Sequence, residues 1–481
     1  MLQSKLILML QNLNKKEMTR FGEFLASPYH NKHPETLALS AHFQRIFPRF
    51  TEKNCERSLI FKKVFGKETF NQKKLNLVFT YTFRLLERFL IQEQLKENTT
   101  TADLLLLQKL RNKHLFNHFE KKLQQTQKTL AQDNIQDSQS FRLQFQLSNE
   151  ADEFYTLQSK HQKDQSLQNK QENLDTFFIS EKLKDACEMF LRNKLLKANY
   201  SIQLLEAVEK KVKDNLEKYS QIPSVAIYYQ IYQMLVYDDA PYFHQLIPIL
   251  EKYIHHFQII EQRSIYDYAQ NFCIARINEG DEIFLAELFK LYQAQLKTDS
   301  LMENGYLLEW HYKNIVTVGL RLQEFDWVLE FIEDFKESLH PDIFQNAYRY
   351  NLAAYYYDTL QYQRVLDLLG QVEFKDIRYS LGAKSILLRT YYDLEEYTAL
   401  ESHSHAFKVY LNRNKLISDY RKKGFYHLIK FTERLAKLKE DLAFISPQKT
   451  HHKLSKIQAD IEASEPIFNK KWLLDKVKGF L

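Results

Sequence analysis

Apolar side chains recur at intervals of three and four residues along most of the chain, the spacing that gives an α-helix one apolar face. Asn14 precedes one such run and is a candidate N-cap, because its side chain can accept a hydrogen bond from a helix N–H group. A helix is therefore predicted after Asn14. The most regular run predicts a helix over residues 72–94, with its inward positions at Leu75, Val78, Phe79, Thr82, Leu85, Leu86, Phe89 and Leu90.

Breaks in this pattern divide the chain into four predicted regions. The first is an N-terminal basic helical domain, or head, in which proline and glycine interrupt short helices. A long-helix region follows and starts an array, and after it come helical repeats and a C-terminal helical tail or cap. The predicted regions are residues 1–97, 98–222, 223–440 and 441–481.

The third region repeats one short pattern, an aromatic residue followed three positions later by a branched apolar residue. The aromatic residues are Phe325, Tyr362 and Tyr397, which lie 37 and 35 residues apart. These intervals are close to the period of about 34 residues of the tetratricopeptide repeat, which is a helix–turn–helix unit. Helix pairs upstream, in residues 228–253 and 266–292, have longer spacings and match the pattern less well.

Residues 346–369 resemble a tetratricopeptide helix pair. That family places a leucine, a small residue and an aromatic residue on the first helix, where this chain has Leu352, Ala353 and Tyr356. The family's usual alanine after the turn is a larger residue here, so looser or differently angled packing is expected. The larger residues are Val328, Val365 and Leu400. The resemblance implies an all-α fold, an α-solenoid of stacked antiparallel helix pairs with the helical head at its N-terminal end.

The amino-acid sequences of whole segments also resemble an uncharacterised bacterial family of helical-repeat proteins. The similar segments are residues 16–31 (KEMTRFGEFLASPYHN), 304–331 and 382–421. This resemblance implies no activity.

Glycine and proline are scarce. The 481 residues include 9 of each, whereas average usage would give roughly 34 and 24. Because these residues form turns, their scarcity indicates long helices with short connections and argues against a β-rich fold. Hydrophobic residues are 44% and charged residues 27%, which excludes global disorder.

Charge is distributed unevenly. The net charge is +6, with +12 in residues 1–130, −7 in residues 131–300 and +1 in residues 301–481. A basic end can meet an anionic partner. The alternative, which we favour, is complementary charge between neighbouring parts of one array.

The three cysteines lie far apart, so neither a zinc ribbon nor a disulfide framework is suggested. Scattered thiols are typical of a reducing compartment. There is neither a cleavage site after the short apolar N-terminal run nor a stretch of 18 apolar residues. We therefore expect a cytoplasmic protein without a membrane span.

Signatures of enzymes are missing. No G-x-x-x-x-G-K-[ST], G-x-G-x-x-G or G-x-S-x-G motif occurs, so nucleotide loops and a serine nucleophile elbow are not indicated. Cys187 and Cys273 lie in apolar helical patterns, where a free cysteine is usually a buried hydrophobe. His114 and His118 share a helix face, but two ligands do not make a zinc site. We predict no enzyme, no cofactor and no metal, and infer no small-molecule substrate.

The best-motivated functional surface is the concave face of the predicted array, because repeat solenoids bind partners along that face. Tyrosine and arginine, which dominate interface energetics, occur there. The sequence therefore predicts a protein–protein interaction scaffold that binds a partner segment in this groove. The predicted partner-binding residues are Lys313, Asn314, Arg321, Tyr350, Asn351, Tyr357, Arg389 and Tyr392, with Thr317, Ala354 and Ser385 also facing the groove.

Nucleic acid is the alternative partner. The head is basic, and residues 408–439 carry ten Lys or Arg residues against two acidic ones. Tyrosines among them could stack on bases. A polar outer face on a terminal capping helix explains the same charge, and we favour that interpretation. The residues of the alternative anionic-partner face are Arg413, Lys415, Arg421, Lys422 and Lys423.

Overall fold

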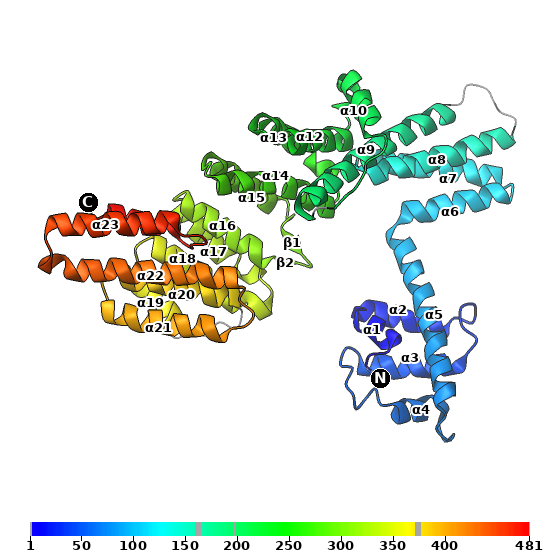
Figure 1. Ribbon diagram of the computed structural model, residues 1–481. Coiled ribbons are helices and arrows are strands. Elements are labelled where there is room, and N and C mark those ends of the chain that lie inside the picture. Colours follow the sequence, from blue (N-terminus) through cyan, green and yellow to red (C-terminus); the bar gives the residue numbers. More distant parts are fainter. Residues whose placement is uncertain (1, 159–164, 197, 371–376, 481) are drawn as a thin grey trace. The chain divides into compact units, whose positions relative to one another are not determined.

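The computed structural model describes residues 2–158, 165–196, 198–370 and 377–480 (Figure 1). About 79% of the chain is helical, and these described ranges contain 24 α-helices. The only strands in the described part are the two-residue β1 (Met302–Glu303) and β2 (Tyr306–Leu307), which pair antiparallel. The predicted all-α class is confirmed. The chain divides into two compact units, Met1–Tyr232 and Gln233–Leu481, while the predicted boundaries at 97, 222 and 440 stay predictions.

The first unit begins with a group of five helices, which are α1 (Lys5–Gln11), α2 (Lys15–Ala26), α3 (Pro34–Ile46), α4 (Arg57–Phe65) and α5 (Gln72–Glu97). α5 packs against α1, α2 and α3 (Figure 1). Its predicted inward positions are buried, apart from the partly buried Leu90. Asn14 caps α2, since its Oδ1 accepts from the Glu17 N–H at 2.9 Å while the Glu17 carboxylate accepts from the Asn14 N–H at 2.7 Å. This reciprocal bonding explains why the helix begins there.

Long helices fill the rest of the first unit, and α8 and α9 pack along each other. A smaller cluster of buried residues, with Phe119 and Phe154 stacked 4.2 Å apart, joins α7 to α8. α12 contains the division between the two units. The helices are α6 (Thr99–Asn112), α7 (Phe116–Gln132), α8 (Ser138–Leu157), α9 (Ser166–Leu196), α10 (Leu205–Asp214), α11 (Leu216–Tyr219) and α12 (Pro223–Tyr237).

Helices of the second unit pack as successive pairs. Its helices are α13 (Ala240–Tyr253), α14 (Ile259–Glu279), α15 (Ile283–Lys297), α16 (Glu309–Arg321), α17 (Phe325–Asp334), α18 (Pro341–Asp358), α19 (Tyr362–Leu369), α20 (Ile377–Asp393), α21 (Tyr397–Arg413), α22 (Asp419–Asp441), α23 (Pro447–Ala463) and α24 (Lys470–Lys478). Within the pairs, α16 contacts α17, α18 contacts α19 and α20 contacts α21. Between them, α16 contacts α18, α18 contacts α20 and α20 contacts α22. The first helices of consecutive pairs therefore line one continuous surface.

One backbone turn recurs in three of these pairs. Two positions after the last residue of the first helix, the chain adopts a left-handed conformation, at Gln323 (φ 62°), Leu360 (φ 60°) or Glu395 (φ 59°). The N–H group of the residue after this left-handed one donates a hydrogen bond to the backbone carbonyl five residues earlier, as in a Schellman motif. The N···O distances in the three pairs are 3.0, 2.8 and 3.0 Å. The second helix then starts at the aromatic residue that the sequence pattern singled out. These residues are Phe325, Tyr362 and Tyr397.

Candidate functional site

A pocket of about 300 Å³ opens on the surface lined by the first helices of the pairs. α16, α18, α20 and α22 each contribute to it, and the connection between α23 and α24 closes one side. The residues that line it are Lys313, Tyr350, Arg378, Leu381, Gly382, Ser385, Ile386, Arg389, Arg421, Phe425, Phe468 and Asn469.

The pocket unites residues from the two surfaces that the sequence predicted separately. Lys313, Tyr350 and Arg389 come from the predicted groove, and Ser385 faces it as well. Arg421 comes from the alternative anionic-partner face. The Lys313 Nζ lies 5.1 Å from the centre of the Tyr350 ring, within the range of a cation–π contact.

Positive charge dominates the pocket. It is lined by four cations and, among the residues that the structure describes, by no carboxylate. Arg378 is partly neutralised, because its Nη2 lies 3.0 Å from Glu309 Oε1. The Arg389 guanidinium stacks 4.2 Å from the Tyr357 ring centre. Its Nε is buried without a hydrogen-bond partner in the described part of the chain. A buried donor without a partner is unfavourable, while the carboxyl group of Asp358 interacts electrostatically with this guanidinium.

The apolar half of the pocket is built by aromatic rings. Phe425 and Phe468 pack with ring centres 4.4 Å apart. The ring of Tyr350 covers Gly382, where any Cβ atom would overlap it. Asn469 Nδ2 donates to Ser385 Oγ at 2.9 Å and ties the closing segment to α20. The pocket therefore combines cations with an apolar wall, the composition expected of a site for a peptide side chain beside an anionic group.

Sequence reasoning missed part of this lining. Arg378 lies one helical turn before Gly382 and was visible as a basic residue of the same helix face. Nothing in the sequence indicates that Phe468 and Asn469 line the pocket, because Asn469 contacts a residue of α20 that lies 84 positions earlier in the chain.

Other predicted groove residues are engaged within the chain. Asn351 is buried and donates to the Ala347 carbonyl at 2.8 Å. Tyr357 is buried, and its hydroxyl donates to Asp393 Oδ2 at 2.6 Å. Arg321 Nη2 lies 3.3 Å from Glu282 Oε1. Asn314 is exposed next to the buried Tyr292, and Tyr392 is buried with 1% of its surface exposed. These residues lie outside the pocket.

The alternative anionic-partner face is open to solvent. Four of its five cations are exposed and Lys422 is half-buried, and within the described ranges none of the five pairs with a carboxylate. Tyr420, 68% exposed, lies among them. The other cations of residues 408–439 include three in ion pairs within the chain, namely Lys408 with Glu433, Arg434 with Asp460 and Lys439 with Glu395.

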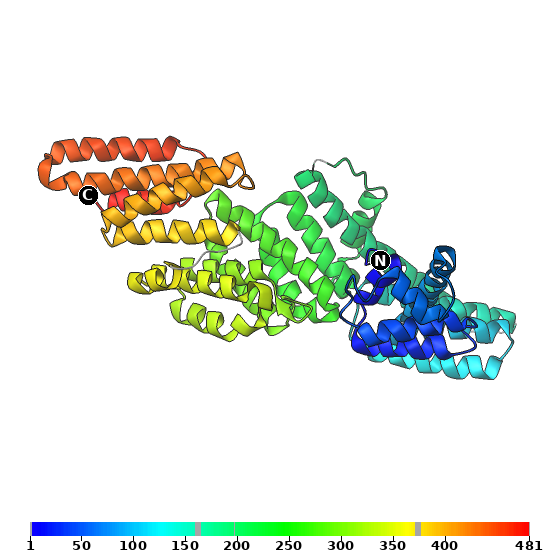
Figure 2. The same ribbon diagram turned by 90° about the horizontal axis from the view of Figure 1, so that it is seen from below.

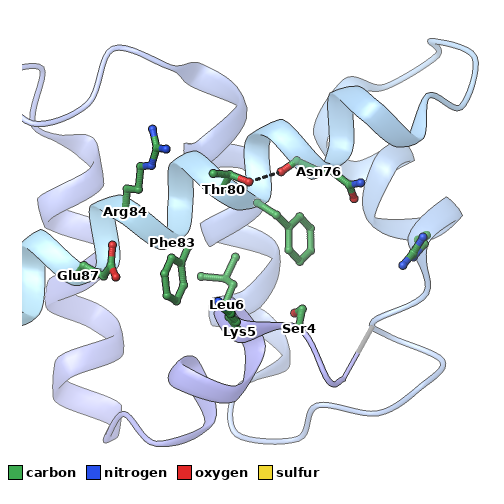
Figure 3. A pocket seen from close by; sticks show the side chains of 10 residues that line it. Ser4, Lys5, Leu6, Asn76, Thr80, Phe83, Arg84 and Glu87 are labelled. Atoms are coloured by element: carbon green, nitrogen blue, oxygen red, sulfur yellow. Dashed lines mark hydrogen bonds between the residues drawn. The ribbon is translucent and has the colours of Figure 1, made fainter.

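The head carries a second cationic hollow, of about 600 Å³ (Figure 3). The apolar side chains of Leu6, Phe79 and Phe83 form its wall. Around them lie Lys5, Arg57 and Arg84, and Glu87 is the one carboxylate among its lining residues. Figure 3 shows Arg84 and Glu87 at one end of the hollow and Ser4 and Asn76 at the other.

The cysteine thiols lie in the interior of the protein. Cys55, Cys187 and Cys273 are buried, and burial raises the pKa of each thiol. A thiolate is the reactive form, so these thiols are poor nucleophiles. In the described part of the chain, no three His, Cys, Asp or Glu side chains gather in an arrangement that could hold a metal ion. No helix there is both long and apolar enough to span a bilayer.

Comparisons with known proteins return no relative. No protein-family model matches the chain, and neither a curated protein nor a solved structure resembles it significantly.

Proposed function

We propose that the protein is a non-enzymatic scaffold that binds a segment of a partner protein through the pocket between α16, α18, α20 and α22. The observation that carries this proposal is the convergence of Lys313, Arg389 and Arg421 on one apolar pocket without a lining carboxylate among the described residues. The segment places an anionic group, such as a carboxylate, between these cations and an apolar side chain against Phe425. Charge-assisted hydrogen bonds to arginine are among the strongest polar contacts in interfaces.

The proposed architecture is a degenerate tetratricopeptide-like α-solenoid. The recurring Schellman turn supports it, because three successive helix pairs repeat the same hydrogen bonds at the same offset from an aromatic residue. Contacts between the first helices of consecutive pairs support it as well. In such an array the first helices face the partner, which is where the pocket opens.

The test is a quantitative capture experiment with the full-length chain from its host's lysate. Lys313→Ala combined with Arg421→Ala removes two pocket cations, and Lys437→Ala is the matched control, because Lys437 is an exposed cation of α22 outside the pocket. Partners that use the pocket should be lost from the double variant by tenfold or more and retained by the control. Equal recovery with all three proteins contradicts the proposal.

The runner-up is a nucleic-acid-associated factor. The cations around Tyr420 favour it, because they have no ion-pair partner in the part of the chain that the structure describes. Phosphate contacts make binding strongly dependent on salt. A variant in which glutamate replaces Arg413, Lys415, Lys422 and Lys423 reverses the charge of this face and leaves the pocket lining intact. If this variant loses a nuclease-sensitive, salt-sensitive partner while the pocket variant keeps it, nucleic acid is the ligand. If it loses nothing, this alternative fails.

A further inference from the structure

The last helix of the chain carries two rows of contacts. Leu473 and Val477 are buried in a cluster with α22 and α23, and Figure 2 shows the red C-terminal helices beside the orange ones. Trp472 and Lys476 lie four residues apart and so share a face of α24, and Asn469 is the residue just before the helix. These three residues are the second row. This second row faces α20.

Each member of the second row has a partner on α20. Asn469 Nδ2 donates to Ser385 Oγ at 2.9 Å. The Trp472 ring packs edge-on against Tyr392, with ring centres 5.4 Å apart. The Lys476 Nζ lies 2.6 Å from Asp393 Oδ1, and the Asp393 side chain is only 6% exposed. A hydrogen bond, an aromatic contact and an ion pair with a buried carboxylate thus join α24 to α20.

The acceptor surface overlaps the predicted partner-binding groove. Tyr392 belongs to that predicted groove, Ser385 faces it, and Tyr357 donates its hydroxyl to the same Asp393 carboxylate at 2.6 Å. At the start of α24, Lys471 Nζ lies 2.8 Å from Glu282 Oε1, which also pairs with the predicted groove residue Arg321. The C-terminal segment therefore lies where the sequence predicted an external partner.

Charge complementarity indicates what this surface selects. Residues 470–478 (KKWLLDKVK) carry four lysines and one aspartate, whereas the residues that meet them include Asp393 and Glu282. A nine-residue helix is too short to be stable by itself in water. α24 therefore owes its conformation to its packing against α22 and α23 together with its contacts to α20, and a segment with the same chemistry can compete for this position.

We propose that the face of α20 formed by Ser385, Tyr392 and Asp393 is a binding site for a basic helical segment with a tryptophan and a lysine four residues later. The chain's own α24 occupies this site reversibly. The inference goes beyond the proposed function, since it does not require the pocket to hold a ligand. It does connect the two, because Phe468 and Asn469 at the start of the segment also line the pocket. A segment that displaces α24 removes one wall of that pocket.

The test uses a fluorescent peptide of residues 465–481 as the probe, titrated into the full-length chain and measured by anisotropy. Lys476→Glu in the chain sets a carboxylate against Asp393 and weakens docking in cis, leaving the α20 face intact. The peptide should bind this variant at least tenfold more tightly than the unaltered chain, where the tethered segment competes at an effective concentration on the order of millimolar. A peptide with Trp472→Ala and Lys476→Glu should not bind, whereas Lys478→Ala, an exposed position, should change little.

Equal binding to both chains, absence of binding to either, or unimpaired binding of the doubly altered peptide overturns the proposal. Hydrogen exchange on the unaltered chain provides a second measurement should the Lys476→Glu chain not fold. With a ¹⁵N-labelled chain and excess unlabelled peptide, the amides of the chain's own residues 470–478 should exchange faster. Unchanged exchange at saturating peptide also overturns it.

Discussion

Among individual residues, Arg389 is the pocket cation whose side chain is most firmly held in place. Its guanidinium is held against the Tyr357 ring, and its Nε is buried without a partner in the described part of the chain. Tyr357 is itself fixed by its hydrogen bond to Asp393. The arginine is therefore preorganised, so that binding an anion requires little loss of side-chain freedom.

Burial of another residue, His311, makes stability dependent on pH. Burial, reinforced by the nearby positive charge of Arg263, lowers the pKa of His311 to about 4. In the unfolded chain the ordinary pKa is about 6.5. Between these values the unfolded state binds a proton that the folded state does not, so unfolding becomes more favourable as the pH falls.

The prediction is that His311→Phe removes part of the loss of stability below pH 6.5. That part is up to about 3 kcal/mol at pH 4. Denaturant midpoints measured between pH 7 and 4 check it. His405→Gln, at an exposed histidine, serves as the control and should follow the unaltered chain. A His311→Phe profile parallel to that of the unaltered chain contradicts the assignment.

At the scale of the elements, the sequence pattern predicted those features of a helix that contacts between neighbouring residues determine. The inward positions of α5, the cap at Asn14 and the start of α17, α19 and α21 follow from neighbours within a few residues. The lining of the pocket was predicted only in part, through Lys313, Tyr350, Ser385 and Arg389 of the groove and Arg421 of the alternative face. The pocket wall formed by Phe468 and Asn469 depends on a contact between residues far apart in sequence, because Asn469 and Ser385 are 84 positions apart. The periodicity of apolar residues does not predict such long-range contacts.

The recurring turn gives a prediction at this scale. Leu360 is 71% exposed and holds a left-handed conformation, φ 60°, which costs a residue with a Cβ atom roughly 1–2 kcal/mol. Leu360→Gly should stabilise the protein by up to about 1 kcal/mol, since the relief exceeds the entropy that glycine loses on folding. Thermal unfolding measures the change. Leu416→Gly is the matched control, because Leu416 is also exposed but has no positive φ, and it should be neutral or destabilising. Equal shifts for both variants would contradict the role of the turn.

At the scale of the whole molecule, each compact unit carries its own core and its own cationic hollow. The hollow of the first unit lies in the head, around Phe83, and the pocket of the second lies around Tyr350. The excess of basic residues in the first part of the sequence is matched by the hollow in the head, which Lys5, Arg57 and Arg84 line. If both hollows bind partners, as a scaffold would require, the two sites on one chain would add avidity.

Separate cores predict separate unfolding. Phe21 in the head and Phe407 in the second unit are fully buried in different clusters, and truncating either to alanine should cost about 3–5 kcal/mol within its own unit. Differential scanning calorimetry should show at least two transitions. Phe21→Ala should lower one of them and Phe407→Ala another, and each should leave the remaining transition within about 1 °C of its original position, since distant sites add independently. The exposed Tyr29→Ala should move neither. A single transition that both core variants lower equally would contradict separate unfolding. In that case the two units unfold together, because the loss of either core would also destabilise the other unit.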